Sequence, residues 1–303
     1  MPDPVLALVG PTASGKSDIA LDFAARWGAE IVAVDAFTVY RGMDVGTAKP
    51  TRKQRDRVPH HAIDLLEPEQ ECTVQWFQAQ ARAAVRDVVS RGRSPLLVGG
   101  SGLYFRAVVD DLVFPPTDPD VRAALEARHA ADPPAAHARL AQRDPAAAAR
   151  IDPDNLRRVV RALEVIELTG STFSSWRTAW DEHHSVFPGL AVVGVARDRD
   201  DLSARVDQRV GTMLARGLVE ECRALAGRRL SRTARQAIGY AEVFEHLTGR
   251  LDLATAHEQI RVRTRRYALR QQRWFQADPR VAWAMPEQVH ATLLRVAEEA
   301  QAD

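Results

Sequence analysis

The apolar positions of this chain fall into two kinds of pattern. Short continuous apolar runs at residues 5–9, 30–34, 95–98 and 190–195 are typical of strands that are buried on both faces of a parallel sheet. The segments between them repeat apolar residues every three or four positions, which predicts helices. The pattern therefore predicts an α/β fold with a parallel sheet at its core.

Helical periodicity extends over five segments around these strands, at residues 18–27, 73–91, 202–225, 255–276 and 286–300. A short apolar run at 281–284 predicts one more strand. Residues 36–70 have no dominant period and contain several glycines and prolines. We expect a long loop there, and a loop of that length in a compact domain is more often functional than not.

The middle of the chain has a different composition. Residues 117–150 are rich in Ala, Arg and Pro, and Asp-Pro pairs there mark helix starts. Since the strand pattern returns at 190–195, we interpret residues 111–185 as a helical insertion domain. The core is then formed by residues 1–110 together with 186–303.

Composition and charge narrow the class of protein only slightly. The 303 residues include 41 basic and 40 acidic side chains, a net charge of +1, so only local clustering can indicate nucleic-acid binding. Cys72 and Cys222 stand far apart with no nearby second cysteine, which argues against a zinc site or a disulfide framework. The N-terminus lacks a signal-peptide pattern, and no apolar run approaches a membrane span of about 18 residues. We expect a cytoplasmic protein without membrane contact.

The first apolar run leads into a phosphate-binding pattern, Gly-x-x-x-x-Gly-Lys-Ser. Glycines allow backbone N–H groups to turn toward a phosphate, and the following helix adds its positive N-terminal end. Lys16 supplies a charge to a terminal phosphate, and the Ser17 hydroxyl is a Mg²⁺ ligand. The pattern predicts phosphate binding without specifying a reaction, because kinases, ATPases and other nucleotide-binding proteins share it. The predicted loop comprises Gly10, Pro11, Thr12, Ala13, Ser14, Gly15, Lys16 and Ser17.

Two polar residues follow later strands of the predicted sheet. Asp35 ends the second strand, and Ser101 lies in a Gly-Gly-Ser-Gly turn after the third. The carboxyl ends of parallel strands line one ligand crevice, so both should lie near the phosphate loop. Asp35 could hold Mg²⁺, act as a general base, or simply cap a turn. Ser101 could be a helix cap or a site hydroxyl.

Arginines gather on one side of two predicted helices. Arg157, Arg158 and Arg161 lie opposite an apolar face, and a solvated surface and a functional surface explain this pattern equally well. The helix at 255–276 favours a functional interpretation, because four like charges on one stripe repel each other unless an anion lies opposite. That stripe consists of Arg263, Arg266, Arg270 and Arg273.

These motifs, in this order, resemble the bacterial tRNA dimethylallyltransferases, also called tRNA isopentenyl transferases. Two motifs are specific to this family, Gly-Met-Asp-x-Gly-Thr-Ala-Lys-Pro and Gly-Gly-x-Gly-Leu-Tyr. The phosphate loop alone is not specific to it. The matching stretches are residues 10–17, 35, 39–50, 60–68, 96–112, 118–122, 155–165, 215–221, 236–240 and 264–275.

The resemblance implies a P-loop NTPase-like core and a prenyl-transfer reaction. The phosphate loop would hold the diphosphate of dimethylallyl diphosphate with Mg²⁺, and the acceptor would be N6 of the adenosine 3′-adjacent to the anticodon in tRNA. Asp35 would be the general base, and Ser101 stands where the family usually has threonine. We infer that Arg205 or Arg209 joins the diphosphate clamp.

The resemblance also implies which residues contact the tRNA anticodon loop, and we expect the enzyme to act as a monomer. The chain departs from the family at Thr38, where glutamine is usual, and at Ala241, where a basic residue is common. The implied contacts are Asp35, Ala36, Phe37, Thr38, Ser101, Arg122, Arg157, Arg158, Val159, Val160, Arg161, Gln236, Ala237, Ile238, Gly239, Tyr240 and Ala241.

Two other functions compete with this interpretation. An adenylate isopentenyltransferase or a P-loop nucleoside kinase would act on a free nucleotide, but neither needs the helical insertion and the arginine-rich faces. A non-catalytic RNA-binding protein would not need Lys16, Ser17 and Asp35 together.

Overall fold

The computed structural model describes residues 4–180 and 182–302. The chain divides into two compact units, one within Met1–Asp110 and Ser185–Asp303 and the other within Asp111–His184. Each unit is described by itself below.

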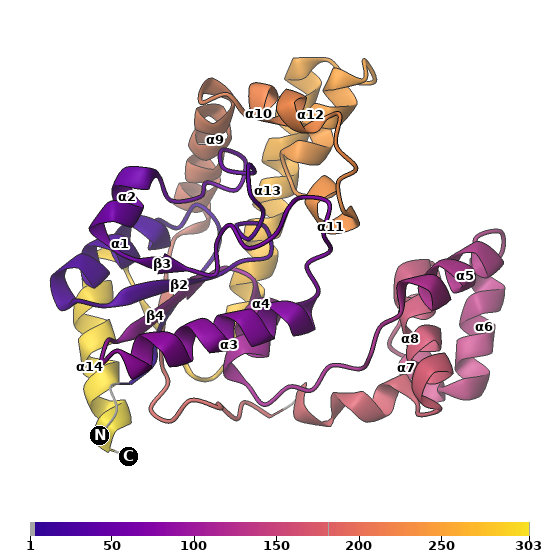
Figure 1. The fold of residues 1–303 in the computed structure, drawn as a ribbon, viewed down its shortest axis with the longest axis horizontal. Coiled ribbons are helices and arrows are strands. Elements are labelled where there is room, and N and C mark those ends of the chain that lie inside the picture. Colours follow the sequence, from indigo (N-terminus) through magenta and orange to yellow (C-terminus); the bar gives the residue numbers. More distant parts are fainter. Residues whose placement is uncertain (1–3, 181, 303) are drawn as a thin grey trace. The chain divides into compact units, whose positions relative to one another are not determined.

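A twisted parallel sheet forms the centre of the first unit (Figure 1). Its strand order is β3-β2-β4-β1-β5-β6, so β1 lies between β4 and β5, with Leu6 opposite both Leu96 and Ala191. The predicted α/β fold is confirmed. The strands are β1 (Leu6–Val9), β2 (Glu30–Val34), β3 (His60–His61), β4 (Pro95–Gly99), β5 (Ala191–Val195) and β6 (Val281–Ala284).

Helices cover both faces of this sheet, because successive strand residues point to opposite sides. Leu8 packs with the helices α1 (Lys16–Trp27) and α14 (Val289–Ala302). Val9 packs on the other face with a larger set of helices. These are α3 (Val74–Ser90), α4 (Gly102–Val109), α9 (Arg199–Ala215), α10 (Leu218–Leu225), α12 (Tyr240–Leu247) and α13 (Leu253–Gln276).

Two segments differ from the sequence prediction. The helix expected over 202–225 is two helices, because Gly217 adopts φ +97° and ends the first one. The loop expected over 36–70 contains β3 and the helix α2 (Arg52–Arg57), which starts with a capping box between Thr51 and Gln54. Two shorter helices complete this unit, α11 (Arg232–Arg235) and a 3₁₀ turn at Pro286–Gln288.

The second unit is helical. An aspartate precedes a proline at three of its helix starts, where Asp118, Asp132 and Asp144 accept hydrogen bonds from backbone N–H groups of the first turn. Leu125, Leu140 and Leu163 belong to its core. The elements are α5 (Pro119–His129), α6 (Pro133–Arg143), α7 (Pro145–Ala148), α8 (Leu156–Thr169) and a 3₁₀ helix at Phe173–Trp180. Across the residues described in both units, no helix is long and apolar enough to cross a membrane.

Candidate active site

The phosphate-loop motif forms a tight turn between β1 and α1. Gly10 has φ +147° and Gly15 has φ +90°, which are backbone conformations that glycine tolerates best. A side chain at Gly10 would also come within 3.4 Å of the backbone of Val195. Ser14 is fully buried, and its hydroxyl finds no hydrogen-bond partner within the described part of the chain. The turn is therefore a cradle that leaves polar groups available for an anion.

The positive charge at this turn is unusually crowded. Burial, together with the nearby Arg209 guanidinium, lowers the pKa of Lys16 to about 8, and Asp35 offsets part of this effect. Burial also lowers the pKa of Arg209. Two cations that destabilise each other in this way would be stabilised by an anion between them. Lys16 Nζ meanwhile donates to the carbonyl of Pro11 at 3.0 Å, which keeps it folded over the loop.

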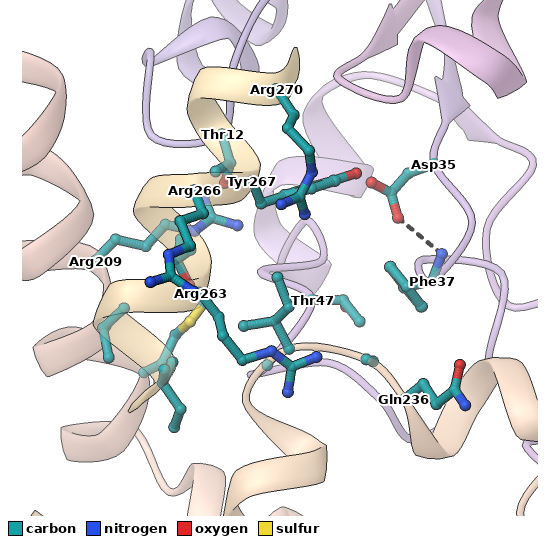
Figure 2. Close-up of a pocket in the computed structure, with 17 residues that line it drawn as sticks. Thr12, Asp35, Phe37, Thr47, Arg209, Gln236, Arg263, Arg266, Tyr267 and Arg270 are labelled. Carbon is teal, nitrogen blue, oxygen red and sulfur yellow. Dashed lines mark hydrogen bonds between the residues drawn. The ribbon is translucent and has the colours of Figure 1, made fainter. Parts of the chain in front are cut away.

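Asp35 follows the last residue of β2, and the two oxygens of its carboxylate have different surroundings. Oδ1 accepts the N–H of Phe37 at 2.8 Å and the N–H of Thr38 at 3.3 Å. This oxygen caps the turn after the strand, as one of the sequence interpretations expected. Figure 2 shows the other oxygen directed toward Tyr267 and Arg270 across the pocket. One half of the carboxylate is thus structural, and the other half is available for chemistry.

Thr12 of the phosphate loop and Asp35 line the same pocket, a cavity of about 470 Å³ (Figure 2). Most of its charge comes from α13, whose residues 263, 266 and 270 are arginines that face the cavity. The polar lining consists of Thr12, Asp35, Thr47, Arg209, Gln236, Arg263, Thr264, Arg266, Tyr267 and Arg270. A single carboxylate among so many cations gives a site suited to a polyanionic ligand and one proton transfer.

The lining contains polar groups that the sequence analysis missed. Tyr267 lines the pocket, and the nearby Gln271 and Ser101 side chains oppose the rise in its pKa that burial causes. Gln271 Oε1 accepts the N–H of Thr12 at 2.8 Å. The spacing of Tyr267 and Gln271, four residues apart on one helix, was the available signal.

The Gly-Met-Asp-Val-Gly-Thr motif is anchored by a carboxylate from α10. Both oxygens of Glu221 accept backbone N–H groups, from Asp44 and Val45 at 2.8 Å and from Gly46 at 3.1 Å. The hydroxyl of Tyr240 donates to the same carboxylate. Gly46 is required there, because a side chain would come within 2.4 Å of the Tyr240 ring. These contacts fix the wall of the pocket that carries Thr47.

The structure brings together many of the residues predicted from sequence. Asp35, Phe37, Arg209, Gln236, Ala237 and Ile238 line the pocket with the phosphate loop, and Ser101 precedes the first residue of α4 and interacts with Tyr267. Arg205 does not join them, because its Nε donates to Asp201 at 3.1 Å. Of the two candidates for the clamp, the geometry therefore favours Arg209.

Other predicted RNA contacts are buried. Tyr240 is fully enclosed beneath the 44–46 loop, and Gly239 is the N-cap of α12. Ala36 and Thr38 are also buried beside the Asp35 turn. These residues shape the pocket wall from behind, and a direct contact between the Tyr240 side chain and RNA is ruled out by its 0% exposure.

The arginines predicted to contact tRNA in the second unit fall into two groups. Arg122 and Arg161 pair with the buried carboxylate of Glu164, at 2.8 and 2.9 Å. Val159 and Val160 are 0% exposed in the core of this unit, so the prediction that their side chains contact tRNA is wrong. They lie on the apolar face of α8. Arg157 and Arg158 are exposed and available to a partner.

Ser17 offers one oxygen ligand for a magnesium ion whose other ligands would be substrate phosphates and water. Ser17 is exposed in the first turn of α1, beside the cradle. Within the described ranges, no group of three His, Cys, Asp or Glu side chains could hold a metal. Mg²⁺ commonly keeps several water ligands and binds through one or two protein oxygens plus substrate phosphates.

Curated sequences identify the family. A protein named tRNA dimethylallyltransferase from Kineococcus radiotolerans is 52% identical over 290 residues, which cover 92% of this chain and 90% of the relative. One from Salinispora arenicola is 50% identical over 282 residues, 92% of this chain and 81% of the relative. This chain belongs to the tRNA dimethylallyltransferase family. It is a prenyltransferase of that family, as the sequence motifs predicted.

Family models and solved structures agree with this assignment to the tRNA dimethylallyltransferases. The model described as IPP transferase matches residues 38–278, and one described as isopentenyl transferase matches residues 4–59. The tRNA isopentenylpyrophosphate transferase of Bacillus halodurans has 37% identity and a TM-score of 0.71, covering 99% of this chain and 98% of that one. A eukaryotic dimethylallyltransferase acting on tRNA has the same fold, with a TM-score of 0.80 at 24% identity over 97% of this chain and 78% of that one.

Proposed function

We propose that this enzyme transfers the dimethylallyl group of dimethylallyl diphosphate to N6 of the adenosine 3′-adjacent to the anticodon in tRNA, releasing diphosphate. The observation that carries the proposal is the pocket lined by Thr12 of the phosphate loop and by Asp35, with Lys16 close enough to interact electrostatically with Asp35 and Arg209. One bond forms, between N6 and the allylic carbon, and one breaks, between that carbon and the diphosphate oxygen. The N6 proton passes to Asp35.

The departing diphosphate needs stabilisation of its negative charge. Backbone N–H groups of the cradle, Lys16 and Arg209 supply it, and an anion would restore the charge of Lys16 that burial disfavours. Mg²⁺ held at Ser17 would add Lewis-acid stabilisation of the diphosphate oxygens. Arg266 and Arg270 on the same pocket wall extend this positive environment toward Asp35 (Figure 2).

Recognition of tRNA requires a base that leaves its stack and phosphates that meet basic side chains. A cavity of about 470 Å³ has room for a purine beside the allylic group. Arg157 and Arg158 on the exposed face of α8 are suited to phosphate contacts. We propose that the enzyme acts as a monomer and, since its proposed substrate is tRNA, that it acts in the cytoplasm.

One experiment separates this function from its alternatives. The enzyme is incubated with Mg²⁺, dimethylallyl diphosphate and either whole tRNA or AMP, and the nucleosides are analysed for prenylated adenosine. We expect product from tRNA only. Product from AMP would favour a free-nucleotide isopentenyltransferase, and product from neither would contradict the proposed reaction.

A further inference from the structure

One side chain of α13 reaches both the phosphate loop and the acceptor side of the pocket. Gln271 is only 5% exposed, although glutamine is usually found at the surface. Its Oε1 accepts the N–H of Thr12 at 2.8 Å.

Tyr267 lies one helical turn before Gln271 on the same helix and lines the pocket. Burial raises the pKa of Tyr267, and the nearby Gln271 and Ser101 side chains oppose that shift. Figure 2 shows the Tyr267 hydroxyl directed toward Asp35. Gln271 therefore belongs to the part of α13 that carries the acceptor side of the pocket.

The backbone on the opposite side leaves no room for an alternative position of the amide. A side chain on Gly100 would come within 2.5 Å of Gln271 Nε2 and 3.0 Å of the carbonyl of Gly10. The glycine turn after β4 is therefore packed directly against the amide. Three segments, the phosphate loop, the turn after β4 and α13, meet at this one side chain.

We propose that Gln271 is a positioning residue that holds the phosphate loop against α13, the helix that carries the pocket arginines. Its amide oxygen sets the position of Thr12, and its NH₂ group packs against the turn after β4. This inference deepens the proposed function and rests on it. Gln271 itself does not touch the reacting atoms.

The main test replaces Gln271 with methionine, which keeps the length of the side chain and removes the hydrogen bond to Thr12. Gln272→Met is the matched control, because the Gln272 side chain points about 100° around the helix axis from that of Gln271. We expect Gln271→Met to lower kcat/KM for dimethylallyl diphosphate and affinity for inorganic diphosphate by about tenfold each, the effect of one lost buried hydrogen-bond pair. Affinity for tRNA and melting temperature should match the control.

A second variant covers the case in which Gln271→Met fails to fold. Gln271→Glu has the same shape and still accepts the N–H of Thr12, but it brings a negative charge toward the diphosphate. We expect a folded enzyme whose kcat falls by at least tenfold.

Binding of inorganic diphosphate separates this inference from the proposed reaction. It is measured without any acceptor, so it tests the role of Gln271 even if the wild-type enzyme prenylates no tRNA. The inference is overturned if Gln271→Met and Gln272→Met bind diphosphate equally well. It is also overturned if Gln271→Met loses tRNA affinity and melting temperature in proportion to activity, which would indicate a merely structural contribution.

Discussion

Replacing Asp35 with asparagine separates its two functions. Oδ1 caps the turn by accepting two backbone N–H groups, from Phe37 and Thr38. Asparagine retains an oxygen for this cap but offers an amide nitrogen to the pocket, and that nitrogen cannot accept a proton. We therefore expect Asp35→Asn to fold normally and to lose about 10²–10⁴ in the rate of the chemical step, the contribution of a positioned general base.

Asp35→Ala should reduce the rate of the chemical step as much as Asp35→Asn does, and it should also reduce the stability of the fold. Two hydrogen bonds disappear, each with a net value of about 1 kcal/mol, so the free energy of unfolding should fall by about 2 kcal/mol. For a chain of 303 residues that corresponds to a decrease in melting temperature of roughly 3 °C. Asp22→Asn, which changes an exposed carboxylate on α1, is the control for loss of charge.

The assay is a single turnover with saturating enzyme and dimethylallyl diphosphate, followed by quantification of prenylated adenosine. Affinity for tRNA is measured separately by filter binding. The reasoning about Asp35 would be refuted if Asp35→Asn retained more than a tenth of the wild-type rate. It would equally be refuted if the rate fell only as far as tRNA affinity did.

Three further predictions concern charge and packing. Since the pKa of Lys16 is about 8 in the folded chain, its charge is lost as the pH rises through 8, so calorimetry should find weaker diphosphate binding at pH 9 than at pH 7. Lys16→Met should remove this lysine-dependent part of the pH effect. Arg158→Ala should weaken tRNA binding and reduce the slope of log K against log salt by about 1, and an unchanged slope would identify a merely solvated surface. Arg161→Ala should instead mainly lower the melting temperature, because Arg161 pairs with the buried Glu164. Gly102→Ala should destabilise the fold, because the new methyl group would lie 1.8 Å from an indole carbon of Trp274. Gly211→Ala on helix α9 has open space around it and should raise the free energy of unfolding in denaturant by about 0.5–1 kcal/mol.

The elements that the sequence predicted well are those set by local chemistry. Apolar runs identified the central strands, and the phosphate-loop glycines gave the turn that follows β1. Asp35 could be placed beside that turn because parallel strands end on one edge of the sheet. The arginine stripe of α13 was visible from helical spacing alone, and three of its four members face the pocket.

The misses have physical causes that no local pattern reveals. Tyr267 was not singled out because its place in the pocket depends on the fold: its ring centroid lies 5.7 Å from the Arg270 guanidinium carbon, and Ser101 comes close to it from a distant segment. Gln271 was overlooked because its partner Thr12 is 259 residues away. Val159 and Val160 were named as contacts only because they lie between matching arginines, and their own apolar character, which buries them, was the better guide.

The link between Thr12 and Gln271 also has a consequence for biosynthesis. The phosphate loop leaves the ribosome well before the helix that completes its surroundings, since Gln271 lies 259 residues after Thr12. Contacts so distant in sequence form late, because the intervening chain must be ordered first. A polypeptide terminated before α13 would therefore carry an intact glycine motif and yet lack a working cradle, so that competence for the allylic donor is acquired only after α13 has been synthesised.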